Sequence, residues 1–204
     1  MSGRDRSSGT YPVLLNLAGR RCLVVGGGPI AYRKVEGLVA AGALVDVVAP
    51  MIVDELAGLA ANSHGRVNLD YRAYQTGDVQ GYWLVIASTN DPVAQQAVFD
   101  DGERLNVWVN AADDPERCSF ILPAVHRREP VTIAVSTGGA SPALAQWLRD
   151  LLAAALPRQL EALVARVRAE RSAIRGSGRS SEGLDWKTRI DTINAELEAA
   201  PPSV

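Results

Sequence analysis

One stretch, residues 21–31 with the sequence RCLVVGGGPIA, constrains the fold of this chain more than any other. A short apolar, β-branched run ends at Val25, Gly26 to Gly28 follow directly, and a helical apolar pattern begins at Ala31. Strand, glycine turn and helix in this order are typical of a dinucleotide-binding unit. A glycine-rich turn in another kind of α/β protein has the same local pattern, so the rest of the chain must decide.

The small residues of this stretch have separate expected roles. Gly26 permits the tight turn, and Gly28 lets the backbone approach the phosphates because a Cβ there would block them. Ala31 takes the third small position, where the helix packs on the strand. The first turn of the helix then offers unpaired N–H groups and a positive dipole end to an anion.

Length and composition are those of an ordinary globular protein. With 204 residues, of which 47% are hydrophobic, the chain can bury the core of one domain with appendages. The formal net charge of −2 gives no basic footprint for nucleic acid, and no segment is long and apolar enough to span a membrane. Residues 1–10 lack the apolar core of a signal peptide and are expected to be a disordered lead. Cys22 and Cys118 have no metal-type spacing, which favours free thiols in a reducing cytoplasm.

The hydrophobic pattern predicts an α/β fold: a Rossmann-type parallel sheet with helices on both faces. Expected strands are residues 22–25, 44–49, 67–71, 83–87 and 106–112, and residues 11–17 are expected to form a short lead-in strand or turn. Helices are expected from Ala31, from Asp54, which is expected to act as a cap, and from Pro92. We assign this NAD-binding domain to residues 11–118.

The character of the chain changes after residue 118. Residues 120–122 and 131–136 are expected strands, with a polar turn, HRREP, at residues 126–130. Ser141 and Pro142 predict a cap and the first residue of a helix that ends near residue 156. We expect residues 119–157 to form a small α+β dimerisation segment and residues 158–204 a helical C-terminal region.

Polar residues at the carboxyl ends of the predicted strands form the candidate site, because ligands of open α/β sheets bind at that edge. Residues 88–91 (STND) follow the fourth strand, and Asp113 and Asp114 follow the fifth. The two acids are explained either by an Asp-Asp-Pro turn or by a carboxylate that moves protons beside a nicotinamide. Asn110 either orients that carboxylate or satisfies backbone groups.

The second strand does not end on the acid that usually binds the ribose hydroxyls of NAD. Residues 49–51 read APM, Asp46 lies too early in the strand, and no arginine is placed there to favour a 2′-phosphate. The fingerprint alone therefore does not choose between NAD and NADP. His64 and His126 are not spaced as a metal pair, so no fixed metal site is expected.

Four segments together resemble the precorrin-2 dehydrogenase/sirohydrochlorin ferrochelatase module of siroheme synthases. They are YPVLLNLAGRRCLVVGGGPIAYRK, LVIASTND, NAADDPERCSFILP and VSTGGASPALAQWLR, which occur in the family's order within residues 11–157. The resemblance implies NAD⁺-dependent oxidation of precorrin-2 to sirohydrochlorin, and in many members the insertion of Fe²⁺ to make siroheme. It also implies a homodimer built through the segment after the nucleotide domain, with a helical region at the C-terminus.

The same resemblance implies the catalytic aspartate and, except for Thr89, the cofactor contacts. The catalytic aspartate falls on Asp113. Cofactor contacts are expected from the glycine turn and from the ends of the second and fourth strands: Gly26, Gly27, Gly28, Pro29, Ile30, Pro50, Met51 and Thr89. Substrate contacts are expected from Asn110, Ser119, Thr137 and Gly138. Because the family also lacks the ribose acid, the expected cofactor is NAD.

Two differences from the family matter. Thr137 stands where some members carry a serine described as phosphorylated, and the large methyltransferase domain of the fused synthases has no counterpart here. We therefore expect no methylation of uroporphyrinogen III. Two alternatives remain open: a dehydrogenase whose metal is inserted by a separate chelatase, and a non-catalytic NAD-binding regulatory module.

Overall fold

The computed structural model describes residues 9–112, 114–178 and 180–199. Residues 1–8 of the expected lead and Asp113, the expected catalytic residue, lie outside the described residues. The chain divides into two compact units, Met1–Leu122 and Pro123–Val204. The segment just after residue 118 therefore groups with the first unit.

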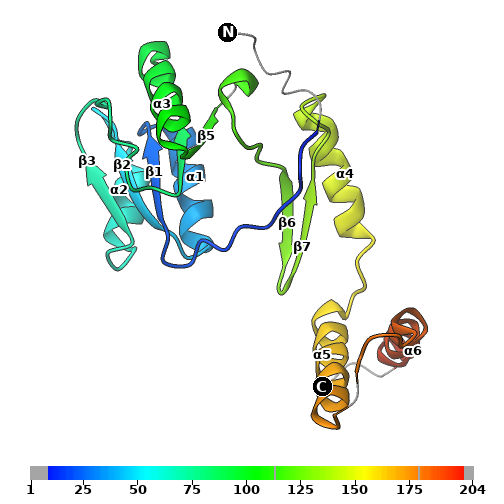
Figure 1. Ribbon diagram of the computed structural model, residues 1–204. Coiled ribbons are helices and arrows are strands. Elements are labelled where there is room, and N and C mark those ends of the chain that lie inside the picture. The colour runs from blue at the N-terminus through cyan, green and yellow to red at the C-terminus, as the bar shows by residue number, and fades with distance from the viewer. Residues whose placement is uncertain (1–8, 113, 179, 200–204) are drawn as a thin grey trace. The chain divides into compact units, whose positions relative to one another are not determined.

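A five-stranded parallel sheet forms the centre of the first unit (Figure 1). Its strands are β1 (Arg21–Val25), β2 (Leu44–Val48), β3 (Val67–Asp70), β4 (Leu84–Ala87) and β5 (Trp108–Ala111). They lie in the order β3-β2-β1-β4-β5, and every neighbouring pair is parallel. The order reverses between β1 and β4, which is the switch point where ligands of such sheets bind.

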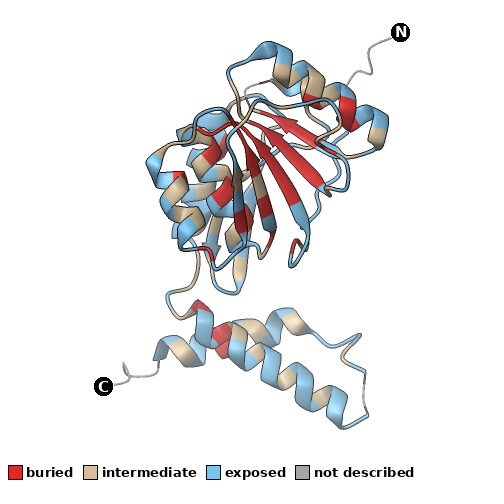
Figure 2. Ribbon diagram, turned by 90° about the vertical axis from the view of Figure 1, so that its left-hand side faces the viewer, coloured by how far each residue is buried: buried red, intermediate tan, exposed pale blue. Residues whose placement is uncertain are grey.

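Helices cover both faces of this sheet, as predicted. They are α1 (Pro29–Ala40), α2 (Asp54–Ala61) and α3 (Pro92–Leu105). The alternation of side chains along β1 builds one core on each face, since Cys22 and Val24 pack with α1 and α2 while Leu23 and Val25 pack with α3. Burial is concentrated on the strands (Figure 2), because a parallel sheet that is covered twice buries nearly every strand residue.

Of the helices α2 and α3, only α3 begins with a side-chain cap. Asp91 caps α3, and its Oδ1 accepts a hydrogen bond of 2.9 Å from the Val93 N–H. Asp54 does not cap α2, so that prediction was wrong: Val53 is the N-cap without a side-chain bond, and Asp54 lies in the first turn. A carboxylate in the first turn still interacts favourably with the helix dipole.

Two predicted strands are shorter or absent. Residues 11–17 form neither strand nor turn, and the chain turns only at Ala18 and Gly19, whose N–H donates to the Gly42 carbonyl at 2.9 Å. β5 begins at Trp108 because Asn106 ends α3 in the left-handed conformation, with φ of 55°.

The second unit begins with a β-hairpin whose position differs from the prediction. β6 (Ala124–Arg128) and β7 (Val131–Val135) pair antiparallel, so His126 and Arg127 lie in a strand and not in a polar turn. Residues 120–122 are not a strand, because Phe120 packs against the first core and its carbonyl accepts a 2.9 Å hydrogen bond from the Asn110 amide. The hairpin is only partly buried, which tolerates charged side chains within its strands.

Three helices complete the second unit. They are α4 (Pro142–Ala154), α5 (Leu160–Gly176) and α6 (Trp186–Ala199). Ser141 caps α4 as predicted, since its Oγ accepts from the Leu144 N–H at 3.2 Å. α5 packs on α6, and the Gln159 amide donates to the Leu197 carbonyl at 2.6 Å. No helix in the described part of the chain has the length and apolarity that a membrane crossing requires.

A buried carboxylate fastens α3 to the loop between β3 and β4. Asp101 accepts 2.6 Å hydrogen bonds from the Tyr74 hydroxyl, the Gly77 N–H and the Arg104 guanidinium. Burial by itself would raise the pKa of Asp101, but these three bonds outweigh burial and lower the pKa below its usual range. The same burial and the bond to Asp101 raise the pKa of Tyr74.

We expect the Asp101→Ala substitution to lower the free energy of unfolding by about 3 kcal/mol, because a buried hydroxyl and N–H would lose their acceptor. The folded pKa lies below the unfolded value of about 3.9, so the carboxylate stabilises the protein above that pH and the effect is lost as the pH falls through the folded pKa. Urea unfolding should therefore show a difference between wild type and variant that shrinks below about pH 4. The exposed neighbour Asp100→Ala is the control, with an expected change below about 0.5 kcal/mol. An equal loss in both variants would contradict this.

Candidate cofactor site

Three loops meet at the carboxyl edge of the sheet, around the glycine turn. Gly26 has a φ of +125°, and a Cβ on it would lie 2.5 Å from the Ser88 carbonyl oxygen in the loop after β4. A Cβ on Gly27 would lie 2.1 Å from the Met51 carbonyl oxygen in the loop after β2. The first two glycines are therefore required by the neighbouring backbone. The sequence pattern explained Gly26 but not the need for glycine at position 27.

Gly28 differs from the two glycines before it. It is the N-cap of α1, and a Cβ on it would meet no atom within 4 Å. Pro29 takes the first helical position, and no side chain caps the helix. The first turn of α1 thus offers N–H groups beside open space, which is the arrangement that holds a dinucleotide pyrophosphate. Ala31 is fully buried against the sheet, so it takes the small packing position that the pattern assigned to it.

A cavity of about 310 Å³ opens next to this helix end. The residues that line it come from α1, from the loop after β4 with α3, and from the turn after β5: Ile30, Ser88, Thr89, Asn90, Gln95, Ala112 and Asp114. Gln95 fixes one wall, because its Nε2 donates to the Thr89 carbonyl at 2.7 Å. The structure thus brings the predicted residues Ile30 and Thr89 together.

Gln95 and Ala112 also line the cavity, and neither was named as a candidate from the sequence. Ser88 and Asn90 belong to the STND segment, so their place at a strand end was a usable signal. Gln95 lies inside a helix, and nothing in its local pattern shows that it turns back toward the loop before α3.

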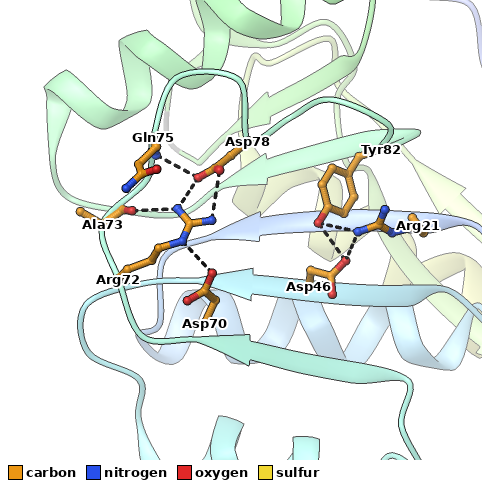
Figure 3. Close-up of polar contacts among 8 residues, drawn as sticks. All are labelled: Arg21, Asp46, Asp70, Arg72, Ala73, Gln75, Asp78 and Tyr82. Atoms are coloured by element: carbon orange, nitrogen blue, oxygen red, sulfur yellow. Dashed lines mark hydrogen bonds and ion pairs between the residues drawn. The ribbon is translucent and has the colours of Figure 1, made fainter.

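Two separate groups of paired polar side chains lie along the sheet (Figure 3), one around Asp46 within β2 and one just beyond β3. Asp46 accepts hydrogen bonds from Arg21 at 2.9 Å and from Tyr82 at 2.8 Å, so it is held inside the sheet as the sequence position indicated. Burial would raise the pKa of Asp46, but the hydrogen bonds that it accepts outweigh burial and lower the pKa. Pro50 and Met51 are exposed beyond β2, and their contact with a cofactor stays a prediction.

An arginine does lie just beyond β3, and it is already paired. Arg72 donates to Asp70 at 2.7 Å and to Asp78 at 2.6 and 3.0 Å (Figure 3). Both carboxylates neutralise the guanidinium, which makes it a poor receptor for a further phosphate.

Two predicted substrate residues support the backbone beside β5. The Asn110 side chain is buried and donates to the Phe120 carbonyl, and the Ser119 hydroxyl accepts from the Val109 N–H at 2.6 Å. These bonds hold residues 118–120 along β5. A direct contact of Asn110 or Ser119 with substrate stays a prediction.

Thr137 and Gly138 belong to the second unit. The Thr137 hydroxyl accepts from the Ser141 N–H at 3.2 Å and donates to the Ser141 carbonyl at 3.1 Å, which closes the loop onto the start of α4. Gly138 has a φ of +62°, and no atom lies within 4 Å of a Cβ built there. Their role toward substrate stays a prediction. Among the described residues, no group of three or more His, Cys, Asp or Glu side chains is arranged to hold a metal ion.

Substitution of adjacent glycines should separate folding from cofactor binding. Gly27→Ala should lower the thermal unfolding temperature markedly, because its methyl group would overlap the Met51 carbonyl. Gly28→Ala should leave that temperature nearly unchanged and weaken the binding of NAD⁺ at least tenfold, on the order of 1.4 kcal/mol, because its methyl group enters the open space at the helix end. Differential scanning fluorimetry and equilibrium NAD⁺ titration measure the two effects. Unchanged NAD⁺ affinity in the folded Gly28→Ala protein would count against this site.

Two family models match this chain, one over most of the first unit and one over part of the second. Residues 13–124, more than half of the chain, match a family model described as "Putative NAD(P)-binding". Residues 128–155 match the model described as "Sirohaem biosynthesis protein central". The first match covers the sheet and the cavity, and the second covers most of the hairpin and α4.

Curated relatives include siroheme synthases of several bacteria. The protein of Pseudomonas fluorescens (strain SBW25) is 46% identical over 162 residues, which are 78% of this chain and 34% of that protein. The protein of Pseudomonas putida (strain W619) is 40% identical over 192 residues, which are 93% of this chain and 41% of that protein. The chain therefore spans only about a third to two fifths of the length of these relatives.

A solved structure described as SirC, precorrin-2 dehydrogenase, is similar over most of both chains. It superposes with a TM-score of 0.70 at 27% sequence identity and covers 92% of this chain and 89% of its own. This similarity and the family match agree with the parallel sheet, the glycine turn and the open N-terminus of α1. The chain belongs to the NAD(P)-binding family, and it continues into the central segment of sirohaem biosynthesis proteins.

Proposed function

We propose that this chain is an NAD⁺-dependent precorrin-2 dehydrogenase that makes sirohydrochlorin for siroheme. One observation carries the proposal: the uncapped start of α1 and the ends of β4 and β5 surround one cavity. The similarity to a precorrin-2 dehydrogenase over 92% of the chain supports the choice of substrate. A cytoplasmic location, expected from the number and spacing of the two cysteines, belongs to the same proposal.

The charges beyond β2 and β3 support NAD⁺ over NADP⁺. A 2′-phosphate needs a free cation near the ribose, and Arg72 is neutralised by Asp70 and Asp78. The exposed side chains of Pro50 and Met51 present no charge to a ribose. NAD⁺ with its unmodified ribose fits this edge better.

The residues of the chain have distinct proposed tasks in the reaction. The N–H groups at the start of α1 bind the pyrophosphate beside Gly28, with Pro29 and Ile30 in the same turn. Thr89, whose carbonyl accepts from Gln95, lines the cavity that would receive the nicotinamide. Bound NAD⁺ supplies the acceptor for a hydride from precorrin-2. Asp113 takes the proton lost in the same two-electron oxidation, so that the macrocycle gains one double bond.

The second unit supports a homodimer. Among the described residues from 123 to 154, only Ala145 is buried, so the hairpin and α4 lack a core of their own. Leu144, Trp147 and Leu151 lie on one side of α4 and are 46, 61 and 54% exposed. A two-stranded hairpin with one helix is marginal alone, and an apolar helix face of this kind is typical of a subunit interface.

The insertion of Fe²⁺ is a second proposed activity, in which iron is a substrate and not a resident cofactor. Asp113 would then also accept pyrrole N–H protons as the metal enters. The alternatives are a dehydrogenase served by a separate chelatase and a non-catalytic NAD-binding module.

The test mixes precorrin-2, NAD⁺ and the full chain, and follows NADH and sirohydrochlorin by absorbance before Fe²⁺ is added. Wild type should form one NADH per sirohydrochlorin, and Asp113→Ala should turn over at least about a hundredfold more slowly with an unchanged Kd for NAD⁺. NAD⁺ binding without any spectral change of precorrin-2 would favour the regulatory module. Full turnover in Asp113→Ala would show that Asp113 takes no part in the oxidation. If siroheme forms after Fe²⁺ addition no faster than without protein, the chain is a dehydrogenase without chelatase activity.

The proposed dimer is tested by charge substitution on α4. Leu151→Glu should convert the dimer to a monomer in sedimentation velocity, because a carboxylate would be buried without a partner. The control is Gln146→Glu, at another exposed position of α4, which should leave the molecular mass in sedimentation unchanged. A monomeric wild type, or a dimer that survives Leu151→Glu, would count against this interface.

A further inference from the structure

A chain of polar side chains joins the turn after β5 to the outer side of α3. It consists of Asp114, Arg117, Gln96 and Asp100. We propose that Arg117 is a positioning residue for the oxidation. Through these linked side chains, called the brace below, Arg117 holds the turn against α3 and so fixes one wall of the cavity. This inference rests on the proposed function. It adds Arg117, which contacts neither substrate nor cofactor in the proposed reaction.

The brace starts at the short helix η1 (Pro115–Arg117). Asp114 caps this helix, and its Oδ1 accepts from the Arg117 N–H at 3.3 Å. The Arg117 guanidinium also pairs with the Asp114 carboxylate through Nη1 and donates through Nε to Gln96 Oε1 at 2.8 Å. One planar cation thus bridges two acceptors on different elements, which a lysine ammonium does not reproduce at the same positions.

The next link is Gln96, which is bonded at both ends of its amide. Its Nε2 donates to Asp100 Oδ1 at 2.8 Å, one turn further along α3. This bond sets the orientation of the amide, with Oε1 turned toward Arg117. The side chains of Asp114 and Arg117 are 22 and 34% exposed, so water screens their pairing less than it screens a pair on the open surface.

The braced turn belongs to the wall of the cavity. Ala112 and Asp114 line it, and Asp113 lies between them in the sequence. The loop after β4, which also lines the cavity, is held from the same helix, since the adjacent Gln95 donates to the Thr89 carbonyl. Two neighbouring glutamines of α3 therefore secure the loops that follow β4 and β5. A shift of about 1 Å in such a wall can reduce turnover by up to about a hundredfold.

This arrangement gives the two consecutive acids different tasks. Asp114 is committed as a cap and as the ion-pair partner of Arg117. It holds the wall and takes no proton in the reaction. The proton acceptor proposed above is Asp113.

The test compares Arg117→Met with wild type in the precorrin-2 assay. The methionine keeps the apolar stem and removes the cation, so we expect kcat to fall about tenfold while KM for precorrin-2 and Kd for NAD⁺ change less than about twofold. Hydrogen exchange in the peptide that covers residues 109–119 should become faster in the variant. Arg117→Lys should recover only part of the lost kcat.

Arg104→Met is the matched control, because Arg104 also pairs three residues away, with Asp101, and lines no part of the cavity. It should change neither kcat nor exchange in residues 109–119. If Arg117→Met does not fold, Gln96→Leu removes the acceptor of Arg117 on α3 at an exposed helix position. It should give the same fall in kcat and the same faster exchange in residues 109–119.

The outcomes separate the brace from the proposed function. Wild-type turnover with an unchanged kcat in Arg117→Met and Gln96→Leu overturns the positioning role alone. A wild type without turnover overturns the proposed function and, with it, the role of Arg117 in that reaction. Exchange in residues 109–119 that is equal in wild type and both variants overturns the brace itself. A loss of kcat in Arg104→Met equal to that in Arg117→Met also overturns the positioning role. The loss of an ion pair on α3 would then lower kcat as much as the loss of the ion pair at Arg117.

Discussion

The close approach of three backbone segments at the glycine turn determines the rest of the site. Gly26 lies against the carbonyl of Ser88, and Gly27 lies against the carbonyl of Met51, so neither position has room for a Cβ. The turn is therefore held from both sides, and α1 begins at a fixed place with its first N–H groups uncapped. Of the three glycines in this turn, Gly28 is the one that faces open space. An anion-binding helix end follows from packing that needs no ligand to form it.

The strand order carries this local geometry to the cavity. Because β1 lies between β2 and β4, the loops after these strands leave the sheet in opposite directions and a crevice remains at its edge. The loop after β4 and the turn after β5 form its walls, and α3 supports them through Gln95 and Gln96. The arginine just beyond β3, Arg72, is paired with Asp70 and Asp78, which leaves little free charge there for a ribose phosphate. These features together favour an NAD⁺-dependent oxidation at this edge.

Much of the fold could be predicted from the sequence, and the failures have physical reasons. Parallel strands buried on both faces are continuous apolar runs, so β1, β2 and β4 were evident in the pattern. β6 was missed because its polar residues, His126 and Arg127, are tolerated in a hairpin that is only partly buried. The tertiary contact of Phe120 with the first core decided against a strand at residues 120–122. In the site, the glycines and the strand ends could be read locally, whereas Gln95 and Arg117 act through contacts that no local pattern contains.

The central claim is that the start of α1 holds the pyrophosphate of NAD⁺ and directs the nicotinamide toward the ends of β4 and β5. A crystal structure of the full chain soaked with NAD⁺ tests it most directly. We expect pyrophosphate oxygens within hydrogen-bond distance of the N–H groups that follow Gly28, with the nicotinamide ring in the cavity beside Thr89 and Ala112. A dinucleotide bound elsewhere on the sheet, or a nicotinamide directed away from the turn after β5, would contradict it.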